Sequence, residues 1–281
     1  MKLRNQLIVI WNVLVMHLNN KYIAIILNRN LGKVCDELRK ELISKGISEV
    51  IIVDSSTDKM LQSKFVTIGA IDKNALEFGY RINRGFNLGL SYALENCEFD
   101  WIFCIPVDTE ILELDLKAFE IDSKQFPKIM AYTLPEKNDP YLPLIKNNIG
   151  LVWNILEGPI LLKQELVSRY KNADNVSLFD DENFRAYLSY KEIAFRIYSA
   201  NFAVGIYNKF LVAEREELLL TYSELMRTES YSLNKQLLIS EGEKWLFQKY
   251  GISDRWAFET VIRLVYDEFL LRNPKYLQIK L

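Results

Sequence analysis

Short apolar runs alternate with amphipathic stretches in the first part of the chain. The runs YIAIIL at 22–27 and EVIIVD at 49–54 have the length and composition of buried strands. Between them, GKVCDELRKELISKG at 32–46 has helical spacing and ends at Gly46. This order of strand, helix and strand predicts a βαβ unit.

The same alternation continues further along the chain. FVTIG at 65–69 is a third strand candidate, GFNLGLSYALENC at 85–97 is a helix behind a glycine-rich turn, and WIFCIPVD at 101–108 is the next buried strand. The pattern predicts an α/β fold with a mainly parallel sheet flanked by helices, in which ligands bind at the carboxyl ends of the strands. Asp54 and Asp108 both lie at such ends.

The two ends of the chain differ from this middle part. From about Phe210 the pattern becomes helical, as in EREELLLTYSELMR and EKWLFQKYG. The start contains an apolar run of about twelve residues broken by Asn12, well short of the roughly 20 that span a bilayer. It could dock on the domain, lie in a membrane interface, or stay poorly ordered. We therefore expect an apolar extension at 1–20, a domain at 21–209 and a C-terminal helical region at 210–281.

Composition narrows the class of protein. With 281 residues, 49% of them hydrophobic, the chain can bury a substantial core. The net charge of -2, without a block of Lys or Arg, argues against nucleic acid as a main partner. Three cysteines with no CxxC pair suit a reducing compartment. We expect a cytoplasmic protein, with peripheral membrane contact and a homodimer left open.

Six segments in order carry a resemblance to a known family. They are ILNRN, EVIIVDSSTD, RGFNLGLSYAL, IFCIPVDTEI, EGPILLKQELV and FDDENFRAYLSYKEIAFRIY. The chain resembles the family-two glycosyltransferases over about 22–207, and most closely their rhamnosyltransferase-like branch, where PVDT stands in place of NPDT. The resemblance implies a GT-A fold, a nucleotide-diphosphate sugar donor, Mn²⁺ or Mg²⁺, and transfer of a hexose to a hydroxyl acceptor on a glycan, lipid or protein-linked group.

An acidic pair follows the buried strand at 101–107. Breaking a sugar–phosphate bond leaves negative charge on the diphosphate, which a metal ion held by one or two carboxylates neutralises. Asp108 and Glu110 are candidate metal ligands, because alternation along an extended chain would direct both side chains to one side. The alternative is that Asp108 caps the next turn and Glu110 is solvated.

The resemblance also assigns a nucleotide pocket. It maps the base or ribose contact to Asp54 and a loop-closing acid to Asp58, although Ser-Ser-Thr-Asp is also good turn and N-cap chemistry. The remaining positions expected to line the pocket are Asn28, Arg29, Asn30 and Val107.

Further positions are assigned to the sugar and the diphosphate. In the family's helix-opening pattern, matched by Gly85, Asn87 and Gly89, small residues let the backbone approach the donor. Arg81 and Arg84 could pair with diphosphate or be solvated. Gly158 fits the small residue that leaves room for the sugar.

The chain departs from the family pattern at the positions of the general base. The family's acid pair falls on Ser189 and Tyr190, neither of which is a useful base at neutral pH. Glu192 or Asp181 could substitute, although Glu192 could equally be a structural acid of the helix. The resemblance implies an inverting glycosyltransferase; the alternative is a catalytically impaired nucleotide-sugar-binding or partner subunit.

Overall fold

The computed structural model describes residues 20–71, 82–156, 158–173, 175–184, 188–215, 217–218 and 231–281. The extension expected at 1–20 lies outside the described residues except for Asn20, and Arg81 lies outside them as well.

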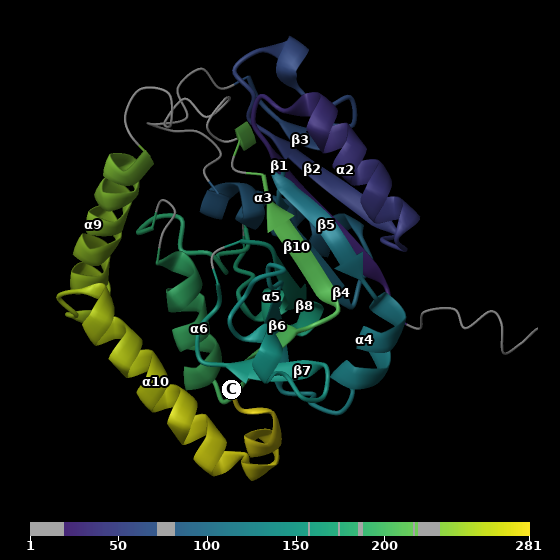
Figure 1. The fold of residues 1–281 in the computed structure, drawn as a ribbon. Helices are drawn as coiled ribbons and strands as arrows, with labels where there is room; N and C mark the ends of the chain where they lie inside the picture. Colours follow the sequence, from purple (N-terminus) through teal and green to yellow (C-terminus); the bar gives the residue numbers. More distant parts are fainter. Residues whose placement is uncertain are drawn as a thin grey trace, which may run out of the picture.

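A mixed sheet forms the centre of the molecule (Figure 1). In the described part of the chain it has eight strands in the order β3-β2-β1-β4-β8-β6-β9-β7. The first four are mutually parallel, β6 pairs parallel with β9, and β8 and β7 are antiparallel to their neighbours. The expected α/β fold with a mainly parallel sheet is confirmed. The strands are β1 (Tyr22–Asn28), β2 (Glu49–Asp54), β3 (Ile68–Gly69), β4 (Trp101–Pro106), β6 (Ile129–Thr133), β7 (Ile149–Val152), β8 (Ile160–Lys163) and β9 (Ala203–Tyr207).

Helices α2 and α3 pack on the sheet because each has one apolar face. In α2, the residues Cys35, Leu38 and Leu42 recur at helical spacing and are buried. The same spacing buries Phe86, Leu90 and Ala93 of α3. The helices are α2 (Gly32–Ser44), α3 (Ile82–Asn96), α4 (Leu116–Ser123), α5 (Gln164–Arg169), α6 (Ser189–Ser199), α9 (Tyr231–Tyr250) and α10 (Arg255–Arg272), with short 3₁₀ turns η1 (Lys59–Leu61), η2 (Leu142–Leu144) and η3 (Pro274–Ile279).

The start of α3 differs from the sequence expectation. The helix already includes Ile82, so Gly85 and Gly89 lie inside it rather than at an opening turn. A Cβ on Gly89 would lie 2.8 Å from the side chain of Ile25 in β1. Gly89 therefore allows α3 to pack closely on the sheet, and the expected role of these glycines in donor approach stays a prediction.

A small second sheet corrects the expected helical character from Phe210 onward. Residues 210–214 form strand β10 (Phe210–Glu214), which pairs antiparallel with β5 (Thr109–Leu114). Burial alternates along β10, with Phe210 and Val212 inside. This pairing returns the chain to the end of β4, beside Asp108.

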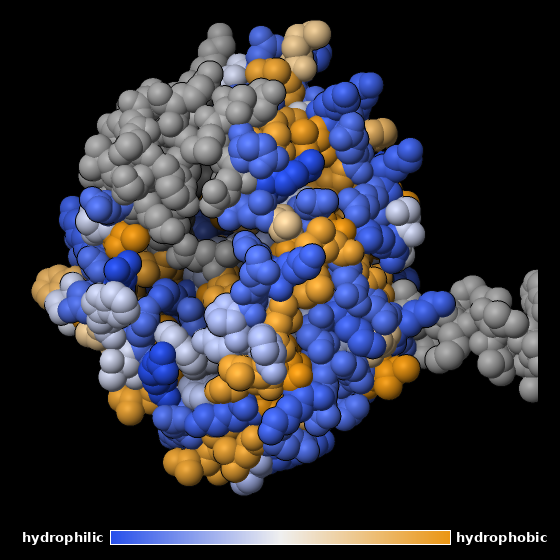
Figure 2. Space-filling model, viewed as in Figure 1, coloured by the Kyte–Doolittle hydropathy of each residue, from blue (hydrophilic) through white to orange (hydrophobic). Residues whose placement is uncertain are grey.

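The C-terminal helices lie along one side of the molecule (Figure 1). Helix α10 packs on α6, and η3 lies against β7, where the N–H of Leu281 donates to the carbonyl of Leu151 at 3.2 Å. Exposed apolar side chains of these helices include Phe247, Trp256, Leu264 and Leu271, and Figure 2 shows apolar side chains along their outer edge. No helix of the described chain is long and apolar enough to cross a bilayer.

Candidate functional site

The topology gathers most of the candidate side chains at one edge of the sheet. Strands β1, β2 and β4 are parallel, with Asn28 paired with Asp54 in register and Leu27 paired with Pro106. Strand β8 runs the other way, so its start meets the end of β4, and Gly158 comes just before it. Helix α3 leads back to the start of β4, so its first turn lies at this same edge.

Asp54 joins several segments at this edge through hydrogen bonds. It is fully buried, and its carboxylate accepts hydrogen bonds from Asn28 Nδ2 at 2.7 Å, from the N–H of Ser56 at 3.0 Å and from the N–H of Ser63 at 2.8 Å. The Ser56 hydroxyl adds a fourth at 2.7 Å. These contacts tie β1 and the loop after β2 together, which favours the loop-forming alternative for Asp54 over direct contact with a nucleotide.

The neighbouring polar residues also serve the loop. Asn30 has a left-handed backbone (φ 63°), and its side-chain oxygen accepts from the N–H of Thr57 at 2.8 Å. Arg29 donates to the carbonyl of Ser55. Asp58 caps η1 by accepting from the N–H of Met60 at 2.8 Å, and it is exposed. The turn-forming alternative accounts for the observed contacts of Asp58.

Asp108 is buried directly after β4. Its side chain accepts a hydrogen bond from its own backbone N–H, and no side chain of the described residues forms a hydrogen bond or an ion pair with it. Burial raises the pKa of Asp108 above its ordinary value, while its own N–H and the nearby Arg215 guanidinium oppose that shift. A buried carboxylate with so little compensation is a group that a cation would stabilise.

Asp108 and Glu110 are not equivalent, contrary to the argument from strand alternation. Val107 and Asp108 form a turn, with the N–H of Val107 donating to the carbonyl of Leu27 at 3.1 Å, and β5 begins only at Thr109. Glu110 is exposed, whereas Asp108 is buried. Period-two alternation therefore does not extend back to Asp108, and the inference that the two carboxylates share a side fails.

Arg215 is a residue that the sequence pattern missed. Its backbone N–H donates to the carbonyl of Asp108 at 2.9 Å, and its Nε is buried without a hydrogen-bond partner among the described residues. The strand alternation of FLVAE at 210–214 could have predicted β10, but not its pairing with β5. That pairing places a cation beside Asp108.

Two residues of α3 have different surroundings. Arg84 is exposed. Asn87 is buried, and its amide both donates to the carbonyl of Phe179 and accepts from the N–H of Phe179 at 3.0 Å. Asn87 therefore holds the chain segment around Phe179.

Asp181 follows the part of the chain that Asn87 holds. Burial raises the pKa of Asp181 above its ordinary value. Its own N–H, the Asn87 amide and the Arg84 guanidinium oppose that shift without cancelling it. Arg84 and Asn87 lie in the first two turns of α3, at the carboxyl edge of the sheet. Asp181 is close to both residues, so it lies at this edge too.

Glu192 has the contacts of a structural acid. It is fully buried in α6. Its Oε2 is ion-paired with Arg196 at 2.7 Å, while its Oε1 accepts from Tyr250 at 2.5 Å and is ion-paired with Lys249 at 3.1 Å. Both oxygens are occupied, so the contacts favour the structural alternative over the role of general base.

The two residues at the positions of the family's acid pair, Ser189 and Tyr190, are also buried in the interior. Ser189 is buried and donates to Asn83 Oδ1 at 3.0 Å, and the ring of Tyr190 packs edge-on against Phe179. Neither residue presents a carboxylate to the site edge. Asn83, which the sequence pattern did not single out, thus joins α3 to the start of α6.

Gly158 has the space that its assigned role requires. Its φ is +143°, and a Cβ built on it would meet no atom of the described residues within 4 Å. A cavity of about 320 Å³ lies elsewhere, at the amino end of β4, and is lined in part by Asp100, Trp101 and Lys163. That cavity is separated from the candidate site by the length of the strand.

Metal-binding side chains are sparse at this edge. Within the described ranges, no group of three or more His, Cys, Asp or Glu side chains could hold a metal ion. Any metal at Asp108 would therefore take most of its ligands from a bound substrate and from water, as Mg²⁺ commonly does.

Comparison with known proteins identifies the fold. No protein-family model matches the chain, and no curated protein matches it significantly. Among solved structures, it is similar to a mannosyltransferase from Pyrobaculum calidifontis in complex with GDP-Man and Mn²⁺, with a TM-score of 0.52 and 13% identity over 97% of this chain and 79% of that one. It is also similar to GalNAc-T7 with UDP, GalNAc and Mn²⁺, with a TM-score of 0.50 and 10% identity over 91% of this chain and 59% of that one. The chain has the GT-A glycosyltransferase fold.

Proposed function

We propose that the protein is a metal-dependent glycosyltransferase that moves a hexose from a nucleotide-diphosphate sugar to a hydroxyl acceptor. The observation that carries this proposal is the buried, weakly compensated carboxylate of Asp108 at the carboxyl end of β4, within a GT-A fold. That edge of an α/β sheet is where ligands bind.

The residues fit a divalent metal ion. Asp108 supplies one hard oxygen ligand, and the oxygens of a diphosphate together with water would complete the shell of Mn²⁺ or Mg²⁺. Glu110 would act at most through water, because it is exposed on β5. When bound, the ion neutralises the negative charge that develops on the leaving diphosphate.

Two arginines supply further positive charge for the diphosphate. The buried Nε of Arg215, beside Asp108, has no hydrogen-bond partner in the part of the chain that the structure describes, and Arg84 is exposed on the first turn of α3. A guanidinium group donates two parallel hydrogen bonds to phosphate oxygens, which positions the leaving group as well as stabilising it. The space that the described residues leave open at Gly158 would accommodate the sugar.

Asp181 is the general base in this proposal. The acceptor oxygen attacks the anomeric carbon, the bond from that carbon to the diphosphate oxygen breaks, and the acceptor proton passes to the Asp181 carboxylate. A base works best with a pKa close to the working pH, and burial moves the pKa of Asp181 in that direction. Attack opposite the leaving diphosphate gives inversion, as the resemblance to family two and its rhamnosyltransferase-like branch implies.

A second candidate function is that of a catalytically impaired nucleotide-sugar-binding or partner subunit. Ser189 and Tyr190 occupy the positions of the acid pair implied by the resemblance. Both make interior contacts and neither is a useful base, which favours this second function. Donor binding without any transfer or hydrolysis would support it.

A donor panel separates these functions. Thermal unfolding is measured with each of several nucleotide sugars, with and without Mn²⁺, and any donor that binds is then tested for slow hydrolysis and for transfer. Binding adds about 2.7 kcal/mol when free ligand is about 100 times its Kd. We expect a Mn²⁺-dependent rise in melting temperature for one nucleotide class, followed by donor turnover. No shift with any nucleotide sugar would contradict the proposed function.

A further inference from the structure

Three helices hold the segment that carries Asp181. This segment, residues 177–184, is bonded to α3 through Asn87 and through Asn83, whose amide donates to the carbonyl of Phe184. Arg196 of α6 donates to the carbonyl of Leu178. The third contact comes from α9, in the C-terminal part of the chain.

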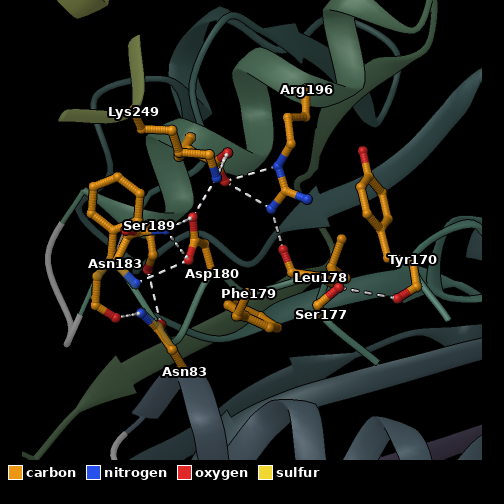
Figure 3. A network of polar contacts seen from close by, with 12 residues as sticks. Asn83, Tyr170, Ser177, Leu178, Phe179, Asp180, Asn183, Ser189, Arg196 and Lys249 are labelled. Atoms are coloured by element: carbon orange, nitrogen blue, oxygen red, sulfur yellow. Dashed lines mark hydrogen bonds and ion pairs between the residues drawn. The ribbon is translucent and has the colours of Figure 1, made fainter. Parts of the chain in front are cut away.

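Lys249, in the last turn of α9, reaches the segment with its ammonium group (Figure 3). It is ion-paired with Asp180, 69 residues earlier in the sequence, and with Glu192 at 3.1 Å. Its side chain is 30% exposed, whereas those of Asp180 and Glu192 are 11% and 0% exposed. The ammonium group thus joins two largely buried carboxylates from different elements.

Asp180 closes the turn that contains Asp181. Its Oδ1 accepts from the N–H of Asn183 at 3.0 Å, and its carbonyl accepts from the N–H of Phe184 at 3.0 Å. Burial alone would raise the pKa of Asp180, but hydrogen bonds from Lys249 and Asn183 outweigh it and hold the pKa below its ordinary value. Asp180 therefore stays ionised, and it binds Lys249 on one side and the turn on the other.

Glu192 fixes the other end of this bridge. Arg196 and Tyr250 hold its carboxylate independently of Lys249. The docking of α9 is itself defined by aromatic packing, because the ring of Tyr250 lies 5.4 Å from that of Phe195 in α6 and stacks 5.7 Å from that of Phe258 in α10. Lys249 therefore reaches Asp180 from a helix end that is packed against α6 and α10.

We propose that Lys249 is a positioning residue: it holds the 177–184 segment so that the Asp181 carboxylate faces the acceptor, making the C-terminal helices part of the site. This inference rests on the proposed function for its catalytic consequence, while its structural half can be tested without a substrate.

The test compares three variants of the full chain. Lys249→Met removes the charge and keeps the aliphatic stem, Lys249→Arg restores a donor, and Lys244→Met is the matched control. Lys244 is exposed on the same helix and lies over the ring of Trp245. For each variant, amide hydrogen exchange is measured in 177–184, together with donor affinity, acceptor KM and kcat.

In Lys249→Met we expect exchange in 177–184 to accelerate about tenfold, while exchange in β1 and β4 stays unchanged, because only the local restraint is lost. Transfer should fall about ten- to a hundredfold with donor affinity kept, since a base displaced by about an ångström loses that much. Lys249→Arg should recover most of both losses, and Lys244→Met should match the wild type.

Unchanged exchange in 177–184, or an equal change in Lys244→Met, would overturn the inference. If Lys249→Met does not fold, Asp180→Asn breaks the same bridge from the other side and is judged by the same measurements. If exchange responds as expected but no variant and no wild-type sample shows transfer, the restraint is real and the proposed function is the part that fails.

Discussion

Asp180 and Asp181 are neighbours in the sequence, yet their surroundings shift their pKa values in opposite directions. Lys249 and Asn183 hold the pKa of Asp180 below its ordinary value against the effect of burial, whereas burial raises that of Asp181. A carboxylate that must stay charged and one that must accept a proton need these different environments. Side-chain surroundings, more than residue type, separate a structural acid from a candidate base here.

The proposed role of Asp181 as general base predicts a pH dependence. The base must be ionised, so the transfer rate should fall as the pH drops through the raised pKa of Asp181. Asp181→Asn should lower the rate about 10²- to 10⁴-fold and abolish that acidic limb. Arg84→Gln should move the limb to higher pH, because the guanidinium opposes the rise in pKa.

Stability provides the control for this prediction. A carboxyl group with a raised pKa binds its proton more tightly in the folded state, so ionising it costs stability as the pH rises through the folded value. Asp181→Asn removes that cost and should not lower the free energy of unfolding at neutral pH. An unchanged pH profile in Asp181→Asn would remove Asp181 from the mechanism.

The hydrogen bonds of Asp54 give a second prediction about a single residue. Asp54→Asn places an amide group against donors such as Asn28 Nδ2 and the Ser63 N–H, and should lower the free energy of unfolding by about 1–3 kcal/mol for each donor left unpaired. Asp58→Asn should be nearly neutral, because Asn also caps helices well. Urea unfolding measures both. Unchanged stability in Asp54→Asn, together with weakened nucleotide binding, would show that Asp54 contacts the ligand instead of holding the loop.

The elements differ in how far local sequence determines them. Strands β1 and β2 and helix α2 were predictable, since each has a clear apolar period and clear ends. Strand β10 was missed because its short apolar run precedes a helical pattern and is stabilised by β5, far away in the sequence. The start of α3 was placed three residues too late, because the glycine pattern was interpreted as an opening turn, whereas Gly89 lies inside the helix and packs closely on Ile25.

Helix α2 supplies a prediction about element packing. A Cβ on Gly32, its first residue, would lie 2.1 Å from the backbone oxygen of Gln62, next to the N–H of Ser63 that bonds Asp54. Gly32→Ala should therefore displace this loop and cost about 1–3 kcal/mol of unfolding free energy, as overpacking usually does.

The exposed neighbour Lys33 gives the matched control for Gly32. Lys33→Ala should leave the urea midpoint almost unchanged. Equal midpoints for Gly32→Ala and Lys33→Ala would show that the loop yields easily and does not depend on close packing against α2.

At the scale of the whole molecule, the site is assembled from segments far apart in the chain. Sequence reasoning placed Asp54 and Asp108 at one sheet edge, because parallel strands bring their carboxyl ends together. It could not find Lys249 or Arg215, since their relevance comes from the docking of α9 and the pairing of β10. It also could not decide whether Glu192 is a structural acid or a general base. That depends on its burial, which is determined by the segments that pack against α6.

The proposed function depends on Asp108 holding a metal ion for a nucleotide-diphosphate sugar. Calorimetric titration of nucleoside diphosphates into the protein, with and without Mn²⁺, tests it most directly, using wild type, Asp108→Asn and Glu113→Gln. Glu113 is an exposed carboxylate on β5 and serves as the control. We predict Mn²⁺-dependent binding in wild type and Glu113→Gln, and loss of the Mn²⁺ dependence in folded Asp108→Asn. Wild-type-like, Mn²⁺-dependent binding in Asp108→Asn would show that Asp108 does not hold the metal ion.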